Sequence, residues 1–246
     1  MGTLASYLNF FQSGGFFMYT VVLVLVFGTA IVLERLIVIT WGQVNGEKLW
    51  NQISPALRAR RMDDALRTCS RSHKPLYQVL AAGIRGMKGI PTREEVQGTL
   101  DEAMIQVIPK LEARLHYLPN LANVATLLGL LGTITGLIHA FTAVSLVDPS
   151  QKAALLAKGI SEAMNTTAFG LVVAVPMMLI HTFLQTRTNR IIDSLEEYSL
   201  RLLNLASQII REEMATEISS TRANGGSEGR KGSSEVGAMK GAGHVR

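Results

Sequence analysis

The sequence is poor in charged residues and in cysteine. Only 17% of its 246 residues are charged, against about 25% in average soluble domains. Cys69 is the single cysteine, which excludes an internal disulfide and a CxxC metal site. Asp, Glu, Lys and Arg are also missing from three long blocks, 1–33, 115–147 and 163–186. A single such block fits a buried core helix, but three together favour a membrane protein.

Each uncharged block is long enough for one membrane span, which needs roughly 20 mostly apolar residues. We place the spans at 16–40, 119–144 and 159–186. The first block could be taken for a signal peptide. No Lys or Arg precedes Arg35, however, and no small-residue cleavage site follows the apolar run, so we expect a retained span.

The basic residues predict the orientation of the spans. Segment 42–118 holds 12 of the 24 Lys and Arg residues and 187–246 holds nine, whereas the connection between the last two spans holds two. Basic segments stay in the cytoplasm. The predicted organisation is a periplasmic N-terminus (1–15), the first span, a cytoplasmic helical segment (41–118), the second span, a short periplasmic loop (145–158), the third span, a cytoplasmic helix (187–217) and a disordered Gly/Ser-rich tail (218–246).

Helical patterns dominate the cytoplasmic parts. Thr92 and Glu95 form a capping box that opens a helix. This helix is expected to run into the second span, with Pro109 and Pro119 as kinks. Two apolar stripes follow helical spacing: Val96, Leu100, Met104, Val107, Leu111, Leu115 and Leu118 in the first, and Ile191, Leu195, Tyr198, Leu202, Leu205 and Ile209 in the second. We expect the second stripe to pack on the first helix, so the fold class is an all-α membrane protein.

Small residues form one face on each of the last two spans. The faces are Ala125, Gly129, Gly132, Gly136 and Ala140 in the second span, and Ala163, Thr167, Gly170 and Ala174 in the third. Such faces let helices approach closely in lipid. We expect these faces to bring several copies of the chain together.

Polar side chains also lie inside the spans. Thr133 and Thr167 fall at one depth, roughly 12–16 Å from the outer surface at 1.5 Å per residue. Glu162 lies one to two turns further out, with Asn165 and Thr166 on its face. An ionisable group inside a span is a functional candidate. The hydroxyls fit two interpretations: they bond to their own helix and only pack, or they line an ion path, expected between subunits.

Three other features of the sequence give weaker evidence of function. "GLLGTITG" lacks the Lys-Ser/Thr pair of a phosphate loop. The sequon at Asn165 lies inside a span, where no glycan fits. His139 and His181 are too far apart in sequence and depth for a metal pair, so packing roles are expected. No metal or organic cofactor is expected.

The segments "LLGLLGTITGLIHAF" (127–141), "GISEAMNTTAFGLVVAVP" (159–176) and "ERL" (34–36) resemble the MotA/TolQ/ExbB proton-channel family, in its three-span TolQ/ExbB branch. The resemblance covers residues 10–215. It implies that Thr133 and Thr167 are pore threonines and that Glu162 is the conserved glutamate of the third span. Asn165 and Thr166 replace residues that are more often aliphatic in the family, so Na⁺ is not excluded beside H⁺.

The resemblance also implies partners. It predicts a homopentamer around a dimer of a single-span protein resembling ExbD or TolR, whose aspartate carries the ion. The chain would then be a non-enzymatic subunit of an ion-driven motor in the bacterial inner membrane, serving a TonB-, Tol- or gliding-type machine. The alternative is a non-conducting scaffold that assembles other proteins through its cytoplasmic helices.

Overall fold

The computed structural model describes residues 15–89, 92–145 and 147–239. The described residues form helices and contain no strand. The helices are α2 (Gly15–Gly42), α3 (Gly46–Arg58), α4 (Met62–Cys69), α5 (Pro75–Gly86), α6 (Arg93–Glu112), α7 (Tyr117–Ser145) and α8 (Pro149–Met239). The predicted all-α class is confirmed. The predicted N-terminal segment 1–15 lies outside the described residues except for Gly15.

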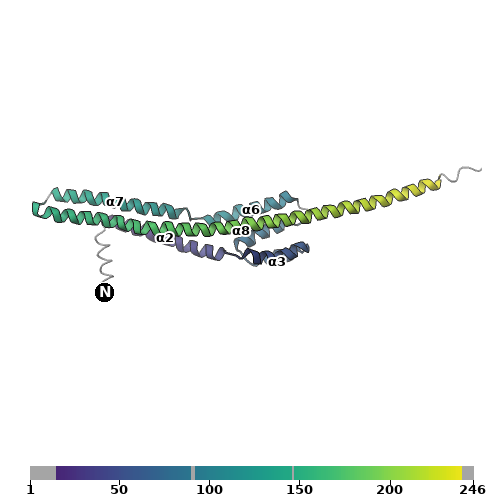
Figure 1. The fold of residues 1–246 in the computed structure, drawn as a ribbon, viewed down its shortest axis with the longest axis horizontal. Helices are drawn as coiled ribbons and strands as arrows, with labels where there is room; N and C mark the ends of the chain where they lie inside the picture. Colours follow the sequence, from purple (N-terminus) through teal and green to yellow (C-terminus); the bar gives the residue numbers. More distant parts are fainter. Residues whose placement is uncertain (1–14, 90–91, 146, 240–246) are drawn as a thin grey trace, which may run out of the picture. The chain divides into compact units, whose positions relative to one another are not determined.

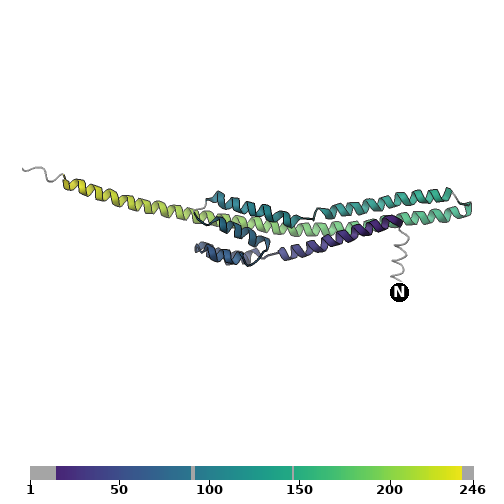
Figure 2. The ribbon, with the colours of Figure 1, turned by 180° about the vertical axis from the view of Figure 1, so that it is seen from behind.

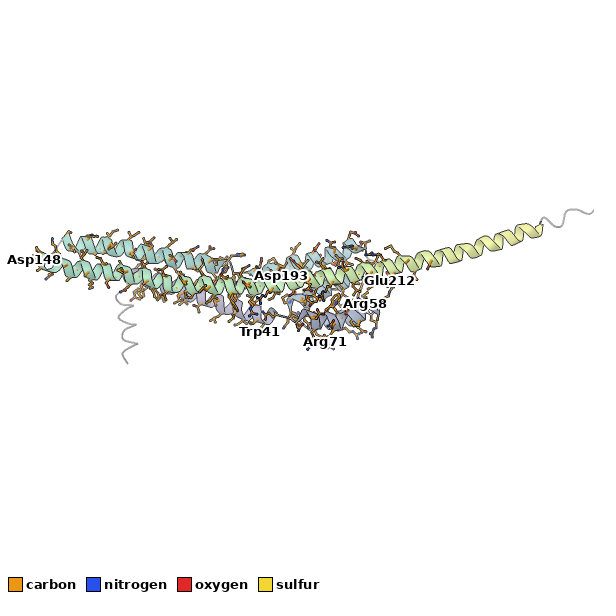
Figure 3. All side chains as sticks on the ribbon, in the orientation of Figure 1. Trp41, Arg58, Arg71, Asp148, Asp193 and Glu212 are labelled. Atoms are coloured by element: carbon orange, nitrogen blue, oxygen red, sulfur yellow. The ribbon has the colours of Figure 1, made fainter. Side chains whose placement is uncertain are left out.

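The chain divides into two compact units, and the first holds the predicted spans. It comprises 1–43 and 107–193, of which residues 1–14 and 146 are not described. In this unit α2 packs on α7. The stretch of α8 that follows Pro149 runs beside α7, and both views of the ribbon show this pair (Figures 1 and 2). Figure 3 labels Asp148 at the short connection between these two helices.

Burial in the first unit is the reverse of that in a soluble protein. The inner contacts are made largely by small residues such as Ala125, Ala163 and Ala174, each 5% exposed or less. The outer faces carry large apolar side chains, for example Phe27, Leu127 and Val172, which are 59%, 64% and 66% exposed. Segments 16–58, 93–145 and 149–216 each contain a window long and apolar enough to cross a membrane. A surface of exposed apolar side chains of this kind is suited to contact with lipid.

The second unit comprises 44–106 and 194–246, of which residues 90–91 and 240–246 are not described. The predicted capping box is confirmed, because Glu95 N donates to Thr92 Oγ1 at 3.2 Å and Thr92 N donates to Glu95 Oε2 at 2.9 Å. The predicted stripe of α8 is buried throughout its six positions. Leu202 of this stripe contacts α5 at Gly83, and Tyr198 contacts α3 at Gly46. The stripe therefore meets α3 and α5, and Ser199 beside it contacts Met104 of the predicted helix at 3.9 Å.

The predicted continuous helix from Thr92 into the second span is wrong. Residues 113–116 form turns between α6 and α7, and Arg114 has a φ of 63°. Proline explains the position of the break. A helix running through Pro119 would lose the hydrogen bond to Leu115, whereas Pro119 is the third residue of α7, where an N–H has no partner in the helix.

Arg35 of α2 contacts the end of α6, next to this break. Arg35 is 5% exposed, and its Nη1 donates to the backbone oxygen of Lys110, 3.2 Å away. That carbonyl lies in the last turn of α6, where no amide of the helix can reach it. The neighbouring Glu34 accepts from Arg35 at 3.4 Å and from Arg114. The end of the first span is therefore tied to the start of the second.

Two further predicted boundaries are wrong. The expected loop 145–158 is much shorter, because α8 begins at Pro149. Proline suits the first turn of a helix, since its missing N–H would have no partner there. The expected disordered tail is helical from 218 to 239. No proline follows Pro176 within α8, and adding residues to an existing helix needs no new nucleus. Residues 240–246 of the predicted tail lie outside the described residues.

Candidate functional site

The small residues of α7 and α8 set the register between the two helices. A Cβ added at Gly129 would lie 3.4 Å from Gly170 Cα, and one at Gly136 would lie 2.9 Å from Ala163 Cβ. A Cβ at Gly159 would lie 2.3 Å from Ala140 Cβ. The helices are antiparallel, and this register brings positions 133 and 167 to one level. Their common depth in a membrane stays a prediction.

These contacts lie within one chain. A Cβ at Gly132 would lie 2.4 Å from Thr166 Cγ2, and one at Gly170 would lie 2.8 Å from the backbone oxygen of Ala125. Gly129, Gly132, Gly136 and Gly170 are thus helix-packing residues, as predicted. Within the chain α7 and α8 cover these faces with each other, and the expectation that the faces also bring several copies together stays a prediction.

The two threonines use their hydroxyls differently. Thr167 Oγ1 donates across to the backbone oxygen of Gly129 on α7, at 2.7 Å. Thr133 Oγ1 donates to Leu130 O in its own helix, at 2.6 Å. In helical geometry the carbonyl of Gly129 also accepts the amide of Thr133. One carbonyl therefore links the two threonines, although their hydroxyls do not bond to each other.

A cavity of about 490 Å³ opens beside these threonines, toward the α7–α8 connection. Its lining comes from α2, α7 and α8: Phe16, Phe17, Gly132, Thr135, Gly136, His139, Ala140, Ala143, Leu155, Lys158, Gly159, Glu162 and Thr166. Along α7 the lining runs from Gly132 to Ala143, which is about 16 Å of helix. That length is roughly half of a bilayer core of about 30 Å. The cavity therefore ends at residues adjacent in sequence to Thr133 and Thr167.

Of the three predicted ion-pathway residues, Glu162 lines the cavity. Lys158, one turn away on α8, and His139 on α7 line the same cavity, and both residues are exposed. In the part of the chain that the structure describes, neither Lys158 nor His139 forms an ion pair with Glu162 within 4.0 Å. The cavity thus presents three ionisable groups that do not neutralise one another by direct contact.

Two hydroxyls complete the polar part of the lining. Thr135 Oγ1 donates to Leu131 O at 2.8 Å, and Thr166 Oγ1 donates to Glu162 O at 2.9 Å. Back-bonding of this kind satisfies a hydroxyl inside an apolar helix. The hydroxyl oxygen of Thr135 has lone pairs that can accept from water. The predicted polar residue Thr166 belongs to the cavity, whereas Asn165 is not part of its lining.

The sequence prediction omitted Thr135, His139 and Lys158 from the site. A signal for them existed in their spacing. Lys158, Glu162 and Thr166 follow one another at four-residue intervals, as do Thr135 and His139, so each set shares a helix face. Thr133 and Thr167 do not line the cavity themselves. Their role along an ion path stays a prediction, as does the expectation that such a path lies between subunits.

Comparison with known proteins gives consistent matches. Residues 71–197 match the model of the MotA/TolQ/ExbB proton channel family. A biopolymer transport protein ExbB homolog of Methanothermobacter thermautotrophicus is 26% identical over 191 residues, which are 77% of this chain and 66% of that protein. The Tol-Pal system protein TolQ of Haemophilus influenzae is 38% identical over 101 residues, 39% of this chain and 43% of that protein. The chain therefore spans less than two thirds of the length of each of these relatives.

Proposed function

The chain belongs to the MotA/TolQ/ExbB proton channel family, and from this premise we propose that it is the channel-forming subunit of a proton-driven motor in the inner membrane. In this role the chain converts the proton gradient into mechanical work in the cell envelope. The similarity to ExbB and TolQ proteins supports this class of machine. The proposal involves no covalent chemistry on a substrate and no bound cofactor beyond the coupling ion.

The cavity is the observation that carries the proposal. It extends over about half of a bilayer core, and its inner end is formed by Gly132 and Thr166, next to the two threonines. The basic residues orient its open end toward the periplasm. Protons would reach Glu162 through this cavity and then pass the level of Thr133 and Thr167. The threonines cannot titrate near neutral pH, so they would hold water or position a carboxylate.

The carboxylate that carries the proton onward would come from a partner. We propose a dimer of a single-span protein resembling ExbD or TolR, which supplies an aspartate at the level of the threonines. Five copies of the chain would surround it. The exposed apolar faces of α7 and α8, with Leu130, Ile134 and Val175 at 50% to 55% exposure, are available for such contacts and for lipid.

Proton flux into vesicles tests the proposal. The chain is reconstituted with its single-span partner, and the pH of the vesicle interior is followed with a dye after a proton gradient is imposed. Flux is expected for the wild type and is expected to be lost in Glu162→Gln. Glu196→Gln is the matched control, because Glu196 is exposed and lies on α8 beyond the third span. Absence of wild-type flux would leave the scaffold alternative as the function of the chain.

A further inference from the structure

The second unit carries opposite charges on two of its sides. Both views of the ribbon show α6 on one side of α8 and α3 on the other (Figures 1 and 2). Between Arg93 and Lys110, α6 has four acidic residues and no basic one. Segment 58–71, which runs from the end of α3 through α4, has five arginines, and all of them are exposed. Since α4 packs on α3, these arginines lie on the side of α3.

The acidic side also exposes large apolar side chains. Ile105 of α6 is 72% exposed and Leu200 of α8 is 59% exposed. Asp101 and Glu102 are exposed and precede Ile105 by one helical turn, so they share its face. In the residues that the structure describes, neither carboxylate forms an ion pair within 4.0 Å. Apolar residues bordered by charges, outside the predicted spans, are typical of a surface that binds another protein.

The basic side has guanidinium groups to spare. Two of its five arginines form ion pairs inside the chain. The other three, Arg58, Arg67 and Arg71, form no ion pair within 4.0 Å in the described part of the chain. Arg67 and Arg71 border one surface hollow, and Figure 3 labels Arg58 and Arg71 on this side of the unit. Guanidinium groups of this kind suit carboxylates, which they can bind with two parallel hydrogen bonds.

We propose that the acidic side of one copy binds the basic side of the next copy, with Asp101 and Glu102 facing Arg67 and Arg71. This inference rests on the proposed assembly of five copies. The charges of the two sides are complementary, so the chain itself supplies both halves of the contact. Because the contact joins two different surfaces, each copy can bind one neighbour on either side. A contact of this kind closes into a ring when its rotation permits.

Cross-linking between copies tests the contact. Glu102→Cys and Arg67→Cys are made separately in a Cys69→Ser background, so that each full-length chain has one cysteine. The two chains are produced together with the single-span partner and treated in vesicles with a short reagent carrying two maleimides. A cross-linked dimer is expected from the mixture and not from either chain alone. Gln208→Cys mixed with Arg67→Cys is the matched control, because Gln208 is exposed but belongs to neither charged side.

Charge reversal tests the pairing itself. Asp101→Lys/Glu102→Lys should weaken association of the copies about tenfold, and Arg67→Glu/Arg71→Glu should do the same. A chain that carries all four changes should recover, because each reversed side then meets an oppositely reversed one. Native mass spectrometry over a dilution series of the full chain in detergent measures the fraction of oligomer.

The outcomes separate this inference from the proposed function. An oligomer that gives no cross-link in the mixture overturns the contact and leaves the assembly in place. A cross-link between two Arg67→Cys chains overturns it too, since the contact would then join identical surfaces. Failure of the fourfold variant to recover overturns the charge pairing. An unchanged oligomer in Arg67→Glu/Arg71→Glu, together with lost binding to anionic lipid vesicles, assigns the basic side to the membrane instead. A wild-type chain that stays monomeric contradicts the proposed assembly itself.

Discussion

The hydroxyl of Thr167 donates to the backbone oxygen of Gly129, 2.7 Å away on the neighbouring helix. This is a contact between α8 and α7 inside one chain. Thr133, at the same level, donates instead to Leu130 in its own helix, at 2.6 Å. The two threonines that resemble the family's pore residues therefore make different contributions to the fold, and their substitutions should be distinguishable.

Replacement by valine should separate the two threonines by stability. Thr167→Val removes a hydrogen bond between helices and should lower the free energy of unfolding by about 0.5–1.5 kcal/mol. Thr133→Val removes a bond within a single helix and should change stability by less than about 0.5 kcal/mol. Unfolding of the purified chain in detergent measures both. Equal losses would contradict the assignment of the cross-helix bond to Thr167 alone.

Glycine substitutions should affect α7–α8 packing before they affect assembly. Gly170→Ala places a Cβ 2.8 Å from the backbone oxygen of Ala125, which cannot move aside as a side chain can. We expect a loss of about 1–3 kcal/mol. Gly98→Ala is the matched control, because nothing lies within 4 Å of its Cβ. In a helix that change should stabilise by about 0.5–1 kcal/mol. Similar melting temperatures for both variants would refute the close approach at Gly170.

Arg35 should be important for the connection between the first two spans. Arg35→Leu keeps much of the apolar volume but removes the donor to the oxygen of Lys110. The carbonyl then loses a hydrogen bond from a charged donor, which costs about 1.5–3 kcal/mol. Arg114→Leu removes only a partly exposed ion pair with Glu34 and should cost less than about 1 kcal/mol. Proteolysis near 113–116 would reveal the loosened turn, and equal resistance of both variants would count against the role of Arg35.

Labelling with an impermeant thiol reagent should establish the orientation. Cys69 is unsuitable as the internal reporter, because it is 1% exposed and burial raises the pKa of its thiol to about 11. The thiolate is the reactive form, so this cysteine should react slowly on either side of the membrane below that pH. In a Cys69→Ser background, Asp148→Cys should label in intact cells and the exposed Glu94→Cys only after lysis. The reverse pattern would invert the topology.

Much of the fold could be predicted from the sequence because it depends on local patterns. The uncharged blocks predicted the three long apolar helices. The Thr92–Glu95 pair predicted a helix start, which two hydrogen bonds confirm. The turn at 113–116 could not be predicted in this way. It depends on a positive φ at Arg114 and on Arg35 of α2, which donates to the backbone oxygen of Lys110, 75 residues away along the chain.

Less of the candidate site could be predicted from the sequence, because the site depends on which helix faces meet. Residue type and depth identified Glu162 and the level of the threonines. They did not show that Thr166 faces Gly132 or that His139 and Lys158 share a cavity with Glu162. Those relationships follow from which faces of α2, α7 and α8 meet, and helix periodicity alone leaves that choice open.

Proton flux through the double variant Thr133→Val/Thr167→Val tests whether the two threonines line the ion path. The variant is reconstituted with the single-span partner, beside Thr133→Ser/Thr167→Ser, which keeps both hydroxyls. Assembly is checked by native mass spectrometry, so that a folding defect is not mistaken for lost conduction. This pore-lining role predicts flux in the serine variant and none in the valine variant, and none when the partner's aspartate is replaced by asparagine. Undiminished flux in an assembled valine variant would contradict it and leave the threonines with packing alone.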